Sequence, residues 1–183
     1  MCGRYASARK REDLLEEFRI DRDRVAADLQ PDYNVAPTKP VYTVLTRSQR
    51  EPGEDGGTDA GAGAGGVADV ARELRVVRWG LVPFWAKDPS IGSRMINARV
   101  ETVDSKPAFR RAFAKRRCLL PADGFYEWLK VEDQGKVRKQ PYYIHRADNG
   151  VLAFAGLYEL WRDKSAPEDH LSCRRSRAGA ARV

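Results

Sequence analysis

The chain has 183 residues, of which 42% are hydrophobic, and its 33 basic and 26 acidic residues give a net charge of +7. This length and composition fit one folded domain and exclude a chain that is disordered throughout. There is neither an apolar run near the roughly 20 residues that span a membrane nor a signal-peptide pattern, so we expect a cytoplasmic protein, nucleoid-associated if bacterial, with no membrane partner.

Metal-binding and redox motifs are not visible in the sequence. The cysteines are Cys2, Cys118 and Cys173, without C-x-x-C spacing, and the only histidines are His145 and His170. A structural zinc site usually needs four clustered ligands of these types, so we expect no metal and no cofactor. Residues 1–169 carry 29 basic and 26 acidic side chains, and this mildly basic body permits nucleic-acid binding.

The first residues, Met1-Cys2-Gly3-Arg4-Tyr5, hold a candidate nucleophile. If Met1 is removed, Cys2 presents a thiol beside a free α-amine, whose reference pKa is about 7.7–8. The amine can form an imine with an aldehyde, and the sulfur can then close a thiazolidine ring. Nearby cations such as Arg4 favour the thiolate. The alternative is that Cys2 is an incidental small residue at the start of a strand.

The first half of the chain predicts short strands and one helix. Residues 2–6 form a strand, and Ser7 caps a helix over residues 8–19, with Leu14, Leu15 and Phe18 buried. The prolines and asparagine of residues 31–38 indicate a fixed loop that contains Asn34, and residues 39–47 alternate as a strand. The Gly/Ala-rich residues 51–72 predict a flexible insertion between this strand and the next, over residues 74–79.

Two clusters after this strand have competing explanations. Trp79 and Phe84 belong to the run Trp79-Gly80-Leu81-Val82-Pro83-Phe84-Trp85, and we weigh core packing and base stacking equally for them. Residues 95–101 alternate, which predicts a strand with Asn97, Arg99 and Glu101 on one face and a core face of Ile96, Ala98 and Val100. The polar face is either solvated or the wall of a site for a phosphate or sugar.

A second helix is predicted over residues 107–115. Phe109, Ala112 and Phe113 would be buried. Its C-terminal end carries a basic cluster of Arg110, Arg111, Lys115, Arg116 and Arg117. These cations suit the helix dipole, or they contact a phosphate backbone.

Glu127 is the candidate general acid and base. In a strand it shares a face with Phe125 and Leu129, and apolar neighbours disfavour the charged form of a carboxylate, which would suit it to proton transfer. A structural role remains equally open. A hairpin around residues 133–135 and strands over 142–145 and 151–160 follow, with His145 more structural than catalytic. The fold class is therefore α+β, with a mainly antiparallel, barrel-like sheet core and peripheral helices.

Taken together, these stretches resemble the SRAP (SOS response-associated peptidase) family, whose members include abasic-site processing proteins. The matching segments are Met1-Cys2-Gly3-Arg4-Tyr5, Asn34-Val35-Ala36-Pro37-Thr38, Trp79-Gly80-Leu81-Val82-Pro83-Phe84-Trp85, Asn97-Ala98-Arg99-Val100-Glu101-Thr102, Arg117-Cys118-Leu119-Leu120-Pro121, Gly124-Phe125-Tyr126-Glu127-Trp128 and Ala155-Gly156-Leu157-Tyr158. Each is weak alone, whereas the ordered set is specific.

The resemblance implies a monomer that binds single-stranded DNA and crosslinks Cys2 to abasic sites as a thiazolidine, a DNA repair activity in a family also described as a peptidase or hydrolase. It implies that Asn97 positions the sugar and that Glu127 moves protons. Arg99 would contact the DNA backbone, and Arg4, Asn34, Trp79 and Phe84 would shape the DNA channel. The competing functions are a thiol (auto)peptidase that uses Cys2 and a non-catalytic module that binds single-stranded DNA.

The C-terminal residues depart from the resemblance. The family has a histidine in an H-x-R-M-P-type segment, which this sequence lacks, and His170 has no matching neighbours. We therefore expect an SRAP-like domain over residues 1–169, incomplete at its C-terminus through truncation or frameshift. Residues 170–183 show no strand or helix periodicity and predict a basic irregular tail.

Overall fold

The computed structural model describes residues 3–48, 70–133, 135–162 and 169–177. Its strands form a smaller sheet in the order β3-β1-β8-β9 and a larger one in the order β2-β5-β4-β7-β10-β11-β6. The smaller sheet contains β3 (Asp32–Val35), β1 (Tyr5–Ser7), β8 (Gly124–Asp133) and β9 (Lys136–His145). The larger contains β2 (Arg22–Asp23), β5 (Val70–Trp79), β4 (Pro40–Ser48), β7 (Arg117–Ala122), β10 (Leu152–Arg162), β11 (Asp169–Arg177) and β6 (Asn97–Arg99).

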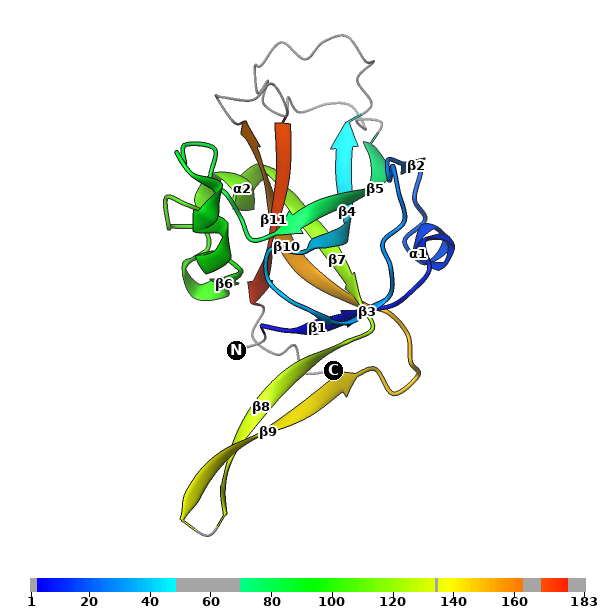
Figure 1. Ribbon diagram of the computed structural model, residues 1–183. Helices are drawn as coiled ribbons and strands as arrows, with labels where there is room; N and C mark the ends of the chain where they lie inside the picture. Colours follow the sequence, from blue (N-terminus) through cyan, green and yellow to red (C-terminus); the bar gives the residue numbers. More distant parts are fainter. Residues whose placement is uncertain (1–2, 49–69, 134, 163–168, 178–183) are drawn as a thin grey trace.

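In the part of the chain that the structure describes, helices are few and short. They are α1 (Arg11–Glu17), α2 (Arg110–Lys115) and the 3₁₀ turns η1 (Pro89–Arg94) and η2 (Val100–Thr102). Helices α1 and α2 lie on opposite sides of the strand core, and the β8–β9 hairpin projects away from the body (Figure 1). Among the residues that the structure describes, no helix is long and apolar enough to cross a bilayer.

The expected α+β class with mainly antiparallel strands is confirmed. Antiparallel ladders join β4 to β5 and β7, and β10 to β7 and β11. Parallel pairs join β2 to β5 and β6 to β11. Strand β11 also touches β5 through two residue pairs, so the larger sheet curves strongly, but the sheets are not closed into a barrel.

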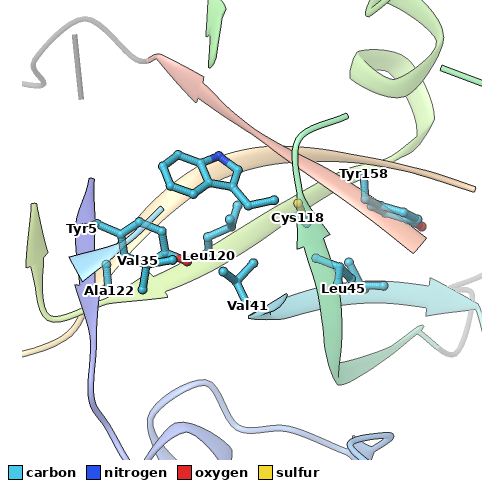
Figure 2. Close-up of a cluster of buried hydrophobic side chains, with 10 residues drawn as sticks. Tyr5, Val35, Val41, Leu45, Cys118, Leu120, Ala122 and Tyr158 are labelled. Atoms are coloured by element: carbon cyan, nitrogen blue, oxygen red, sulfur yellow. The ribbon is translucent and has the colours of Figure 1, made fainter. Parts of the chain in front are cut away.

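The main core lies where the two sheets meet. Tyr5 and Val35 come from the smaller sheet, and Leu45, Leu120 and Tyr158 come from the larger one, all of them buried. Figure 2 shows these side chains facing one another across the interior. Strand β4 is buried on both faces, because its alternate residues also pack against α1 and β5 in a second cluster that includes Leu14, Tyr42, Val44 and Leu74.

Two buried carboxylates are paired within the larger sheet. Glu159 is 3% exposed, and Arg116 donates to its carboxylate at 2.6 Å. Glu73 is also 3% exposed and accepts from Arg75 at 2.8 Å. Since a buried charge is tolerated only when it is paired, these ion pairs allow two acidic residues inside the sheet.

The first helix starts later than the sequence pattern indicates. Helix α1 begins at Arg11 with Lys10 as a cap that makes no side-chain hydrogen bond, while Ser7 lies in β1, so the prediction of Ser7 as cap is wrong. The Asp123 carboxylate instead accepts from the Ala8 backbone N–H at 2.6 Å and from Arg9 Nε at 3.0 Å. These long-range bonds hold the preceding residues outside the helix.

Two further local predictions are corrected. Strand β6 ends at Arg99 and the chain turns into η2, so Glu101 does not continue the strand face and Val100 is 46% exposed. In α2, Phe109 and Ala112 are buried but Phe113 is 37% exposed, because the helix has only six residues and one buried side.

The expected insertion and tail also differ from the structure. Strand β5 already begins at Val70, and the rest of the insertion expected over residues 51–72 lies outside the described residues. The tail predicted to be irregular contains β11, which has strand partners on both sides. Backbone pairing with β10 and β6 imposes this strand, although the sequence has no alternating pattern there.

Candidate functional site

Strand β1 sets the N-terminal residues against β8. Tyr5 pairs with Phe125, and the Tyr126 backbone N–H donates to the Arg4 carbonyl at 3.1 Å. If this register continued by one more residue, Glu127 would lie opposite Gly3. A Cβ on Gly3 would meet nothing within 4 Å, so space is open beside the backbone there. Cys2, the next residue toward the terminus, lies outside the described residues.

Tyr5 and Trp79 connect β1 to the segment that carries Asn97. The two rings meet edge to face with centroids 5.2 Å apart, and both side chains are at most 1% exposed. Trp79 Nε1 donates to the Ile96 carbonyl at 3.2 Å, immediately before Asn97. This chain of contacts brings the start of β6, where Asn97 is half-buried, to the strand that leads to Cys2.

Strand β11 fixes the register of β6. Asn97 pairs with Arg175 and Arg99 pairs with Arg177 in a parallel ladder. Both predicted site residues therefore lie on one short strand, two positions apart, and Arg99 is exposed. This partner strand could not be predicted from the sequence, since the composition of residues 170–177 gives no alternating signal.

Glu127 lies at the margin between the core and the exposed hairpin. It is half-buried on β8, opposite Tyr142 of β9. Of its two neighbours on that face, Phe125 packs against the ring of Phe154 at 5.8 Å, but Leu129 is 55% exposed. The expected apolar surroundings are therefore present on the core side only.

Asn34 is exposed on β3, the outer neighbour of β1. Its backbone N–H donates to the Asp32 carboxylate at 2.8 Å, and Lys39 Nζ donates to the same carboxylate at 2.6 Å. The hydrogen bond from Lys39 lowers the pKa of Asp32. This ion pair holds the turn in front of β4 and fixes the backbone beside Asn34.

The two aromatics that the sequence analysis treated alike differ in the structure. Trp79 is fully buried, so core packing explains it, and no ring face is available for a base. Phe84 is 52% exposed, and the Arg111 guanidinium lies 4.7 Å from its ring centroid. Trp85, which the sequence analysis did not single out, is 54% exposed beside it.

The loop that carries these aromatics is anchored to the fold. Gly80 has φ +130°, and a Cβ there would lie 2.5 Å from the Gly92 carbonyl oxygen, so the close approach of the loop to η1 requires glycine. Beyond the aromatics, Trp161 Nε1 donates to the Ala86 carbonyl at 2.8 Å. The loop is thus held in place on both sides of Phe84 and Trp85.

The basic cluster of α2 divides into two groups. Arg116 pairs with buried Glu159 and serves the fold, whereas Arg110, Arg111 and Lys115 are exposed on α2. The surface group favours contact with an anionic partner. Arg117 is also exposed, at the start of β7.

His145 has structural contacts, as expected. Its ring stacks on Tyr143 with centroids 5.3 Å apart, and its Nδ1 lies 2.9 Å from the Arg146 carbonyl oxygen. Within the described ranges, no three His, Cys, Asp or Glu side chains lie together in a way that could hold a metal ion.

Comparisons with known proteins agree with the family resemblance of the sequence motifs. The sequence model of the family SOS response associated peptidase (SRAP) matches residues 1–174. The chain is 38% identical over 161 residues to the abasic site processing protein YoqW of Bacillus subtilis, covering 88% of this chain and 61% of that protein. It is 35% identical to the abasic site processing protein YedK of Escherichia coli, covering 86% and 59%. The chain thus spans about three fifths of these relatives.

Solved structures show the same fold. A protein from Bacteroides thetaiotaomicron superposes with a TM-score of 0.68 at 26% identity, covering 96% of this chain and 67% of that one. A phage-related protein from Bordetella bronchiseptica has a TM-score of 0.62 at 29% identity. The match to the family over most of the chain, together with these relatives, shows that the chain belongs to the SRAP family.

Proposed function

We propose that this protein binds single-stranded DNA and processes abasic sites by forming a covalent crosslink through Cys2 after Met1 is removed. The observation that carries the proposal is the arrangement around β1. Tyr5 of β1 pairs with Phe125, two residues before Glu127 on β8, and the Tyr5 ring contacts Trp79, whose indole N–H donates to the carbonyl of Ile96, the residue before Asn97. These contacts support a site in which the Glu127 carboxylate and the Asn97 amide act beside the N-terminal backbone that leads to Cys2. The names of the relatives support an abasic site as the substrate.

The proposed chemistry needs only groups of this chain and the DNA. The Cys2 amine attacks the aldehyde carbon of the ring-opened abasic sugar, and loss of water gives an imine. The thiol sulfur then adds to the imine carbon while its proton moves to the nitrogen, which closes a thiazolidine. One water leaves and no oxidant or reductant is consumed.

Charged and polar side chains have separate roles in this proposal. Glu127 moves protons during ring opening, dehydration and reversal. Asn97 orients the sugar, and Arg99 and Arg4 contact phosphates. Asn34 and Phe84 lie along the path of the bound DNA. Trp79 acts by packing on Tyr5 rather than by stacking on a base.

The test is a denaturing gel of protein mixed with single-stranded oligonucleotides that contain or lack an abasic site. We expect a shifted band that requires the abasic site, and mass spectrometry should find protein that begins at Cys2. Cys2→Ala should abolish the band, whereas the control Cys173→Ser should retain it. Binding without a band that survives denaturation would reject crosslinking and favour a non-catalytic DNA-binding module.

A further inference from the structure

The connection between β9 and β10 contains an asparagine followed by a glycine, and the turn gives a reason for each. Asn149 has φ +55°, in the left-handed region that asparagine adopts more readily than most residues. At Gly150, a Cβ would lie 2.8 Å from Arg146 Nε and 3.0 Å from Asp148 Oδ1, so a larger residue would displace both side chains. The backbone of this turn therefore favours the pair Asn149-Gly150.

An asparagine followed by a glycine has a reactivity of its own. When the glycine N–H loses its proton, the nitrogen can attack the asparagine Cγ, and the Cγ–Nδ2 bond breaks as ammonia leaves with a proton from water. The product is a five-membered succinimide in the main chain, which water opens to aspartate or isoaspartate. Glycine has no Cβ to hinder this attack. Asn149 is exposed, so water reaches it.

Hydrogen bonds hold the attacking nitrogen of Gly150 in a fixed direction. Its N–H donates to Asp148 Oδ1 at 2.9 Å. Arg146 donates to both oxygens of the same carboxylate, through Nε at 2.9 Å and through Nη2 at 2.6 Å. The hydrogen bond from Arg146 lowers the pKa of Asp148, so this carboxylate is ionised at neutral and alkaline pH. A negatively charged acceptor stabilises the protonated amide and opposes the loss of its proton.

From these contacts we infer that Asn149 is a site of spontaneous deamidation and that Asp148 holds the reaction back while the turn is closed. The Asn149 N–H donates to the Arg146 carbonyl at 3.0 Å, which closes the turn. The attack on Cγ needs the Gly150 N–H released from Asp148, so the conversion of Asn149 records how often this turn opens. The inference goes beyond the proposed function and uses neither DNA nor Cys2.

The modified residue lies beside a contact that reaches the N-terminal segment. Arg9 donates through Nη2 to the Asn149 carbonyl and through Nε to Asp123 at 3.0 Å. Asp123 also accepts from the Ala8 N–H, between β1 and α1. Deamidation adds one negative charge at residue 149. In the isoaspartate product the main chain gains one carbon, and the carbonyl that accepts from Arg9 becomes a free carboxylate. Conversion therefore changes the surroundings of Arg9.

The test follows the peptide that contains Asn149 during incubation at mildly alkaline pH. Replacing the amide –NH₂ by –OH raises the mass of the peptide, and chromatography separates its aspartate and isoaspartate forms. Conversion in the folded parent protein should be about 10- to 100-fold slower than in urea, the difference expected for a hydrogen bond to a charged acceptor. Asn34 and Asn97, which precede valine and alanine, are internal controls and should convert more slowly than Asn149 in urea.

Variants of the turn separate the hydrogen bond to Gly150 from the ion pair. Asp148→Ala removes the acceptor and should speed conversion in the folded protein about 10- to 100-fold. Arg146→Ala breaks the exposed ion pair but keeps the acceptor, so it should speed conversion no more than about 5-fold. The matched control, Asp133→Ala, breaks another exposed ion pair and should leave the rate unchanged. An Asp148→Ala protein that converts like the parent, or only as fast as Arg146→Ala, would overturn the role of Asp148.

The comparison within the parent protein needs no variant and tests the site directly. Absence of conversion at Asn149 in urea would show that the pair is not reactive and would overturn the site. Equal rates in the folded and the unfolded parent protein would overturn protection by the turn. The crosslinked band on an abasic oligonucleotide is measured in a separate assay, so either result leaves the proposed function unaffected.

Discussion

The ring of Tyr5 meets the indole of Trp79 edge to face, with centroids 5.2 Å apart and planes inclined by 70°. The contact lies in the core between the two sheets, and Trp79 continues it to β6 by donating to the Ile96 carbonyl. The position of the N-terminal strand relative to Asn97 thus depends on two aromatic residues that cannot themselves reach a ligand.

Replacing Trp79 by phenylalanine tests this link. The variant loses the bond to Ile96 and part of the core volume, so the free energy of unfolding should fall by about 2 kcal/mol in urea titrations. Amide hydrogen exchange in Asn97–Arg99 should become faster. The control Trp85→Phe changes an exposed tryptophan and should stay within about 0.5 kcal/mol. Unchanged exchange in β6 would show that Trp79 does not hold that strand.

Replacing Glu159 by alanine tests the buried ion pair with Arg116. The two side chains are 4% and 15% exposed, so the variant leaves a largely buried cation without its carboxylate. We expect a loss of about 3 kcal/mol in the free energy of unfolding. Asp133→Ala breaks the exposed pair with Arg138 and should cost less than about 1 kcal/mol. Similar losses in both variants would contradict the role of burial.

The Asp32–Lys39 pair predicts a dependence of stability on pH. The hydrogen bond from Lys39 lowers the pKa of Asp32 in the folded state. The contribution of the ionised Asp32 carboxylate to stability is therefore present above its unfolded-state pKa of about 3.9 and is lost as the pH falls through the folded-state pKa. Asp32→Asn keeps an oxygen for the Asn34 N–H but removes the charge. The stability difference between parent and variant should be constant near neutrality and shrink below about pH 4. A stability difference that does not change over this pH range would show that the charge of Asp32 does not stabilise the fold.

Replacing Glu127 by glutamine tests its proposed role in proton transfer. The variant keeps the shape of the side chain, so the crosslinking rate on an abasic oligonucleotide should fall about 100-fold while affinity for abasic-free DNA is unchanged. Single-turnover gels measure the rate, and anisotropy measures the affinity. Glu132→Gln, an exposed acid on the same strand, serves as the control. Equal losses of rate and affinity would assign Glu127 a structural role.

Several elements could be predicted from local sequence. The β8–β9 hairpin follows from the turn signal in the sequence of residues 133–135 between β-prone runs, and the alternation in residues 39–47 matches β4. The limits of α1 could not be predicted in this way. They depend on Asp123, which is 115 residues away from Ala8 in the chain and accepts its N–H.

The candidate site was predictable in its residue types but not in its arrangement. The ordered motifs identified Asn97, Arg99 and Glu127, because their neighbours carry the family pattern. Only burial in the structure distinguishes Trp79, which is in the core, from Phe84, which is exposed. The sequence cannot distinguish them, because an aromatic residue has the same hydrophobicity in a core and on a surface. The partner of β6 was also missed, because backbone hydrogen bonds to a neighbouring strand need no particular side chains.

The sequence by itself determined the family, the strand-rich class and the reactive residue types, because these depend on motif order and periodicity. Only the tertiary structure decided which strand holds Asn97 and Arg99, that Trp79 is core, and that Arg111 stacks on Phe84. These relationships join residues far apart in the chain. They arise from strand pairing and side-chain packing between distant segments, which no local pattern contains.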